Sequence, residues 1–169
     1  MAAGRGDGFR PRVDVRPSGV GFAAGQPLVL VYPDTHRRGS SQPALRLDAA
    51  ALVTTRIPLG AFVISPNFRH PVPLARELQT LLDIAGDRLL MGLGAGGTPD
   101  DVLLGQHPVT PRERVDRFQE FVRLLDLILT DDHVNFAGEH YRAVDMRLVG
   151  GAVRGRIPLL LAGNGPRSV

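Results

Sequence analysis

RLLMGLGAGGTPDD, residues 88–101, begins as an apolar strand and runs into a glycine-rich turn. Gly92, Gly94 and Gly97 have the G-x-G-x-x-G spacing of a dinucleotide-binding turn, in which a helix must begin inside the turn to hold the pyrophosphate. Prolines and two adjacent carboxylates follow instead, and we expect no helix before about residue 110. The stretch therefore favours a loop at the end of a barrel strand, where bare backbone admits a flat ligand. A turn that needs glycine only for packing is the alternative.

Strand and helix patterns alternate on both sides of this stretch. Short apolar runs predict strands at residues 27–32, 56–65, 88–94 and from 157 onward. Helical spacing predicts helices at residues 43–53, 70–86 and from Thr110 onward. Residues 133–144 indicate a small hairpin or an irregular insertion. The inner stripe of the last helix is expected to be Val115, Phe118, Val122, Leu125 and Leu129.

The strand runs are continuously apolar, which is typical of parallel strands covered on both faces. The sequence therefore predicts an α/β chain with about four parallel strands. A four-stranded open sheet and a part of a larger barrel both fit this pattern.

The composition argues against several classes of function. All 20 basic residues are arginines, the net charge is only +3, and the arginines are spread along the chain, so we expect no nucleic-acid partner. The chain has no cysteine for a disulfide or a thiolate, and its histidines lack metal-ligand spacing. No apolar run is long enough for a membrane span, and the first residues make a poor signal peptide. We expect a cytoplasmic protein with no metal and no membrane contact.

Four stretches, taken together, resemble one protein family. They are TTRIPLG at residues 54–60, FRHP at 68–71, GLGAGG at 92–97 and IPLLLAGNGPR at 157–167. Over about residues 28–169 the chain resembles the bacterial luciferase-like monooxygenases, and within them the actinobacterial flavin- or deazaflavin-dependent oxidoreductases. The resemblance implies a TIM (β/α)8-type barrel, of which this chain would hold roughly the second to the fifth strand.

The resemblance also implies a domain organisation and a function. We expect an irregular tail at residues 1–26 and a partial barrel domain at residues 27–169, a truncated family member with weak activity or none alone. The implied activity is that of an oxidoreductase or monooxygenase acting on a small organic substrate with FMN or coenzyme F420. A homo-oligomer is a further expectation. Two alternatives stay open: an inactive half-barrel that binds no cofactor, and an open-sheet nucleotide-binding domain.

Cofactor-binding residues follow from the resemblance at three strand ends. A bulge with a non-prolyl cis peptide is expected at Phe62–Val63, with Ser65 just beyond, to support the back of a flavin-type ring. An ordinary buried strand is the alternative there. The residues expected along the ribityl chain are Gly94, Ala95, Gly96 and Gly97. The residues expected around the phosphate are Ala162, Gly163, Asn164, Gly165 and Arg167, with a plain turn at residues 163–165 as the alternative.

Asp34 is the catalytic candidate, because family members often carry a polar residue facing the ring at the end of that strand. A buried carboxyl in this place can have a raised pKa suited to acid–base chemistry, whereas a turn cap before Thr35 is the alternative. His70 opens a helix and is expected to cap it. Arg69 would either meet an anionic group of the ligand or bridge to an acidic residue.

Overall fold

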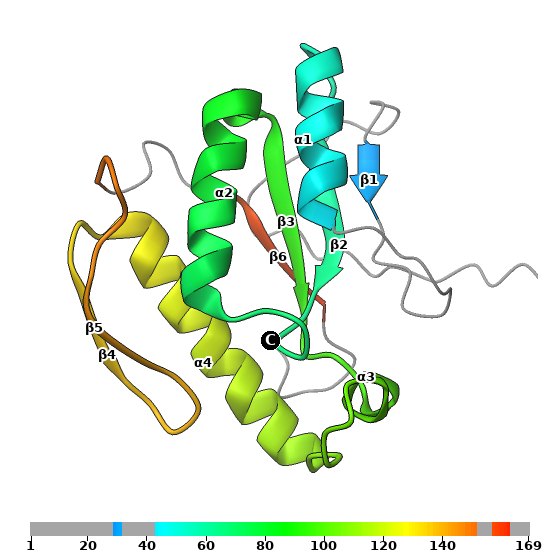
Figure 1. The fold of residues 1–169 in the computed structure, drawn as a ribbon, viewed down its shortest axis with the longest axis vertical. Helices are drawn as coiled ribbons and strands as arrows, with labels where there is room; N and C mark the ends of the chain where they lie inside the picture. The colour runs from blue at the N-terminus through cyan, green and yellow to red at the C-terminus, as the bar shows by residue number, and fades with distance from the viewer. Residues whose placement is uncertain (1–28, 32–42, 152–156, 163–169) are drawn as a thin grey trace, which may run out of the picture.

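The computed structural model describes residues 29–31, 43–151 and 157–162 of the chain. These residues form a parallel sheet with helices on one face, and a separate two-stranded hairpin (Figure 1). The predicted tail, residues 1–26, lies outside the described residues, so the domain boundary at residue 27 stays a prediction.

Four strands form the sheet in the order β1-β2-β3-β6, and every neighbouring pair is parallel. They are β1 (Val29–Val31), β2 (Leu59–Ile64), β3 (Leu89–Gly94) and β6 (Leu159–Ala162). Each strand lies inside a run that the sequence predicts as a strand, so the α/β class is confirmed. The described strands form an open sheet and do not close into a barrel.

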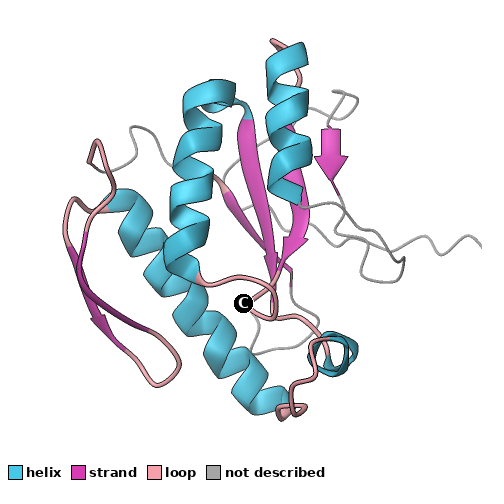
Figure 2. Ribbon diagram, viewed as in Figure 1, coloured by secondary structure: helices cyan, strands magenta, loops and turns pink. Residues whose placement is uncertain are grey.

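Three helices lie on one face of the sheet, in front of it in Figures 1 and 2. They are α1 (Pro43–Val53), α2 (Pro71–Ala85) and α4 (Pro111–Thr130). The core between these helices and the sheet is largely leucine, with Leu59, Ala61, Leu89, Met91 and Leu93 from the strands and Leu74, Leu78 and Leu81 from α2. Removing these side chains from water supplies most of the free energy that holds the helices on the sheet.

The two long helices begin with the caps that the sequence predicts. His70 Nδ1 accepts a hydrogen bond from the Val72 N–H at 3.2 Å, so His70 is a helix cap. Thr110 Oγ1 accepts one from the Glu113 N–H, also at 3.2 Å. A proline follows each cap at the start of the helix, where its missing N–H costs no hydrogen bond.

The predicted inner stripe of α4 is right only in part. Phe118, Leu125 and Leu129 are buried, but Val115 and Val122 are only half-buried. The buried face of α4 is instead completed by Phe121, Leu124 and Ile128. The face is rotated toward these residues because α4 packs against α2.

A 3-10 turn, η1 (Gly86–Arg88), follows α2, and the Arg88 side chain reaches the end of α1. The Arg88 guanidinium donates hydrogen bonds to Ala51 O at 3.2 Å and to Thr54 Oγ1 at 2.9 Å. These bonds satisfy backbone and side-chain oxygens where α1 ends. They also fix the entry into β2.

A short helix, α3 (Thr98–Leu103), begins directly after the glycine turn, so the expectation of no helix before about residue 110 is wrong. Pro99 lies in the first turn of α3, where a proline is tolerated. Asp100, which was expected to oppose a helix start, stabilises it, because its carboxylate accepts the Gly97 N–H at 3.0 Å. The helix spans only 6 residues and ends at Leu103.

The predicted hairpin is present as antiparallel strands β4 (Val134–Ala137) and β5 (Arg142–Met146), and it packs beside α4. Glu120 of α4 holds its tip: the carboxylate accepts the backbone N–H groups of Glu139, His140 and Tyr141 at 2.8, 2.9 and 3.2 Å. Burial raises the pKa of Glu120, but the three hydrogen bonds together outweigh it and leave the pKa below its usual value.

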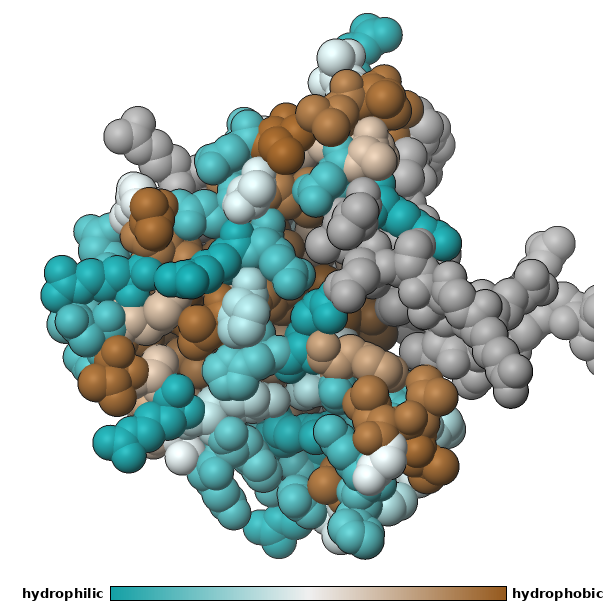
Figure 3. Space-filling model, viewed as in Figure 1, coloured by the Kyte–Doolittle hydropathy of each residue, from teal (hydrophilic) through white to brown (hydrophobic). Residues whose placement is uncertain are grey.

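Apolar side chains gather over α3 on the face seen in Figure 3. Val102, Leu103 and Leu104 are all exposed there, although they are large and apolar. Among the described residues, no helix has the length and apolar character needed to cross a membrane.

Candidate functional site

The carboxyl ends of β2, β3 and β6 lie side by side at one edge of the sheet, beside α3 in Figure 1. Ile64 pairs with Leu93 across β2 and β3, and Gly94 pairs with Ala162 across β3 and β6. The loops that follow these strands are therefore neighbours. This is the edge at which parallel α/β proteins and barrels place their sites.

The strand β2 carries a bulge at the position that the sequence predicts. Ala61 lies opposite Met91 and Ile64 opposite Leu93, so β2 has one residue more than β3 between the two pairs. The peptide bond between Phe62 and Val63 is cis. The predicted bulge and the predicted cis bond are thus both present.

The bulge turns two consecutive side chains of β2 away from the helices. Ala61 belongs to the core on the helix side, whereas Phe62 and Val63 lie over two glycines of β3. A Cβ on Gly92 would lie 2.5 Å from Phe62 Cδ2, and a Cβ on Gly94 would lie 2.8 Å from Val63 Cγ2. The first two glycines of the G-x-G-x-x-G spacing therefore leave room for the side chains of the neighbouring strand.

The turn after β3 lies against the loop after β2. Gly96 has φ +77°, in the left-handed region that favours glycine, and a Cβ there would lie 1.8 Å from Asn67 Oδ1 and 3.3 Å from Ser65 Oγ. Ser65 and Asn67 are both buried. The predicted residues Ser65 and Gly96 are thus brought into one place, although they are far apart in the sequence.

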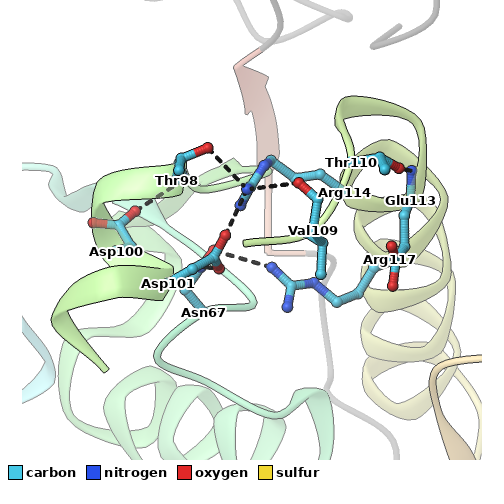
Figure 4. A network of polar contacts seen from close by, with 10 residues as sticks. Asn67, Thr98, Asp100, Asp101, Val109, Thr110, Glu113, Arg114 and Arg117 are labelled. Atoms are coloured by element: carbon cyan, nitrogen blue, oxygen red, sulfur yellow. Dashed lines mark hydrogen bonds and ion pairs between the residues drawn. The ribbon is translucent and has the colours of Figure 1, made fainter. Parts of the chain in front are cut away.

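A buried polar network joins this turn to α3 and α4 (Figure 4). The Asn67 side-chain amide donates to Asp101 Oδ1, and Arg117 Nη2 donates to Asn67 Oδ1 at 3.1 Å. Arg114 Nη2 forms an ion pair with Asp101 Oδ2 at 2.6 Å. The same Arg114 atom also lies 3.4 Å from Thr98 Oγ1 and from Val109 O.

The network carries more positive than negative charge, because it contains two guanidinium groups and one carboxylate. Asp101 is only 1% exposed. The hydrogen bond from Arg114 lowers the pKa of Asp101 and outweighs its burial, which raises it, so the group is ionised at neutral pH. Arg114 Nη1 and Arg117 Nε are buried and have no hydrogen-bond partner among the described residues.

Of the remaining candidate residues, the structure describes Arg69 but not those near Asp34 and Gly163. Arg69 forms an ion pair with Glu77 of α2 at 3.6 Å, in agreement with the expectation that it bridges to an acidic residue. The residues Asp34, Gly163, Asn164, Gly165 and Arg167 lie outside the described residues. Over the described ranges, no cluster of three or more acidic, histidine or cysteine side chains is arranged to hold a metal ion.

Sequence reasoning missed Asn67, Asp101, Arg114 and Arg117 as a unit. One signal was available: Arg114, Phe118, Phe121 and Leu125 have the spacing of one buried helix face, and Arg114 is a charge in line with that apolar stripe. A charged residue on such a stripe needs a buried partner. Nothing in the local sequence identifies Asp101 or Asn67 as that partner.

Comparison with known proteins decides between the barrel and the nucleotide-binding alternative. A family model for luciferase-like monooxygenases matches residues 29–169. The chain belongs to the luciferase-like monooxygenase family. The short helix after the glycine turn is therefore part of a luciferase-like α/β fold, and Asp100 accepts the N–H of its N-cap residue, Gly97.

One similar family member is an F420-dependent glucose-6-phosphate dehydrogenase of Mycobacterium avium (strain 104), 33% identical over 142 residues. The match covers 79% of this chain and 41% of the relative, so the chain spans less than half the length of that enzyme. Curated relatives from other bacteria show the same coverage, for example Amycolatopsis mediterranei (strain U-32) at 29% identity and 41% of its length.

Two solved structures of luciferase-like barrels share the fold. An F420-dependent secondary alcohol dehydrogenase in complex with an F420–acetone adduct has a TM-score of 0.69 at 22% identity, over 80% of this chain and 43% of that one. A riboflavin lyase with modified FMN and riboflavin has a TM-score of 0.69 at 18% identity, over 78% of this chain and 34% of that one. At these identities the likeness concerns the fold.

Proposed function

We propose that the ends of β2, β3 and β6 form part of a binding site for coenzyme F420 or FMN. The whole protein would then be an oxidoreductase or monooxygenase that acts on a small organic substrate. The observation that carries this proposal is that every described candidate residue lies at one edge of the sheet, from Phe62 on β2 to Ala162 on β6. The names of the similar proteins support the choice of these two cofactors.

The residues at this edge fit a flat, polar cofactor. Residues 94–97 are three glycines and Ala95, so this turn exposes backbone and a single methyl side chain. A Cβ on Gly96 would collide with Asn67. Phe62 and Val63 lie on the face of the sheet opposite the helices and would contact one side of the ring. Ser65 is buried beside the turn and would stiffen it from behind.

The bound cofactor would supply the redox chemistry, and this chain would bind and orient it. We propose that Gly163, Asn164 and Gly165, with Arg167, hold the phosphate, and that Asp34 orients the substrate or donates a proton. A cytoplasmic location and a homo-oligomeric state belong to the same proposal. An inactive half-barrel that binds no cofactor is the alternative to this proposal.

Titration of the purified chain with F420 and with oxidised FMN, followed by quenching of cofactor fluorescence, tests the proposal. We expect one of the two to bind with a Kd below about 1 mM, and F420 more tightly than FMN, given the relative's name. Failure of both to bind below about 1 mM would support the inactive half-barrel.

A matched pair of variants locates the site. Gly97→Leu adds a large side chain to the turn, at a position whose backbone is extended (φ −141°) and where a Cβ would lie 3.3 Å from Pro99 Cδ. Gln106→Leu adds a leucine at an exposed position beyond α3. We expect Gly97→Leu to weaken cofactor binding by about tenfold or more and Gln106→Leu to leave it unchanged. Equal binding by the two variants would place the cofactor elsewhere.

A further inference from the structure

The buried network around Asn67 joins four segments: the loop after β2, the glycine turn, α3 and α4. We infer that Asn67 and Arg117 are positioning residues that hold the turn at residues 95–97 in the shape that binds the cofactor. The inference rests on the proposed function for its cofactor. Its first readout, the rigidity of the turn, does not depend on that function.

The orientation of the Asn67 side chain is set from both ends. Arg117 can only donate a hydrogen bond, so it selects the amide oxygen of Asn67. Asp101 is ionised and can only accept, so it selects the amide nitrogen. Rotating the amide by half a turn would place nitrogen against guanidinium and oxygen against carboxylate, and both contacts would repel.

The fixed amide oxygen lies against Gly96, where a Cβ would come within 1.8 Å of it. Gly96 has a left-handed backbone, which its neighbours must maintain because a free chain with glycine samples many conformations. Asn67 therefore restricts the backbone conformations of the turn at Gly96. The hydrogen bond from the Gly97 N–H to Asp100 restricts the turn at Gly97.

The network acts through the turn and not by touching a ligand. Arg114 is 8% exposed and Asn67 is 7% exposed. The unpaired atoms Arg114 Nη1 and Arg117 Nε are buried as well, so a ligand has no access to them in this structure. Residues 95–97, by contrast, are half-buried and directly follow the end of β3.

Arg117→Met is a suitable probe, because Arg117 is half-buried and methionine keeps most of its aliphatic length. The variant removes the donor that orients Asn67. Arg117→Lys restores one donor and should rescue it. Arg123→Met, at an exposed position on the same helix, is the matched control.

Two measurements are made on the full chain: amide hydrogen exchange of Gly96 and Gly97, and the Kd for F420 and FMN. For Arg117→Met we expect exchange to be about tenfold faster and the Kd about tenfold higher, since a hydrogen bond from a charged donor is lost. Arg117→Lys should recover most of both effects, and Arg123→Met should change neither.

The outcomes separate the inference from the proposed function. Unchanged exchange in Arg117→Met overturns the inference, and so does faster exchange with an unchanged Kd. Equal effects in Arg117→Met and Arg123→Met also overturn it, because they would reflect helix charge in general. If the unmodified chain binds neither cofactor, the proposed function fails, and the exchange rates alone decide whether Asn67 and Arg117 fix the turn.

Discussion

The side chain of Phe62 lies over Gly92, so closely that a Cβ on Gly92 would come within 2.5 Å of Phe62 Cδ2. The same Cβ would lie 2.8 Å from Ala61 O. The bulge in β2 and the glycine in β3 therefore depend on each other. A regular strand at residues 61–64 would not place Phe62 and Val63 on the same face of the sheet.

Gly92→Ala should destabilise the chain through this contact. We expect a loss of about 2 kcal/mol in the free energy of unfolding, because the methyl group overpacks against Phe62 and the backbone of Ala61. The double variant Phe62→Ala/Gly92→Ala should cost less than the sum of the two single changes. Urea denaturation of the four proteins measures this coupling, and strictly additive losses would show that the two residues do not touch.

Gly96→Ala should be more damaging than Gly105→Ala, although the two glycines have similar backbones. Their φ angles are +77° and +68°, so an alanine pays a backbone cost of about 1 kcal/mol at either position. Only Gly96 has a neighbour in the way: nothing lies within 4 Å of a Cβ on Gly105. We expect Gly96→Ala also to displace Asn67 and weaken cofactor binding. Thermal melts and cofactor titrations check both effects, and equal behaviour of the two variants would contradict the packing described for the turn.

Local patterns in the sequence predict most of the framework. Pro43–Val53 is predicted as a helix with the bounds that the structure has, and Thr110 and Pro111 mark the start of α4 correctly. These predictions are correct because caps, first-turn prolines and apolar runs determine structure within a few residues. The error at α3 has a similar local cause: the Asp100 carboxylate accepts the Gly97 N–H and so stabilises a helix start that it was expected to oppose.

The polar network could not be predicted in the same way. Asn67 and Asp101 are 34 residues apart, and Arg117 is 50 residues from Asn67. These contacts exist only because β2 and β3 end side by side and α4 returns beneath them. The bulge at Phe62–Val63 was found through the family resemblance, since no pattern in the residues themselves indicates it.

Asp101→Asn should remove a pH-dependent part of the stability. The hydrogen bond from Arg114 holds the pKa of Asp101 below its usual value. The ion pair therefore stabilises the fold above about pH 4, and this stability is lost as the pH falls through the folded-state pKa. At neutral pH we expect a loss of about 3 kcal/mol, because Arg114 stays buried without its charged partner. Denaturation of both proteins from pH 7 downward should show the difference between them shrinking below pH 4. A difference that stays constant with pH would mean that Asp101 is not ionised in the fold.

Glu120→Gln should loosen the tip of the hairpin and leave the sheet unaffected. Glu120 uses both carboxylate oxygens, Oε1 for the Glu139 N–H and Oε2 for the His140 and Tyr141 N–H groups. Glutamine has one acceptor oxygen, so at least one of these N–H groups loses its partner, at a cost of about 1–2 kcal/mol. Amide exchange at Glu139, His140 and Tyr141 should become faster, whereas exchange in β2 and β3 should not change. The control Glu139→Gln alters an exposed carboxylate at the same tip, and a response equal to that of Glu120→Gln would mean that loss of charge at the tip, and not loss of the three hydrogen bonds, loosens the hairpin.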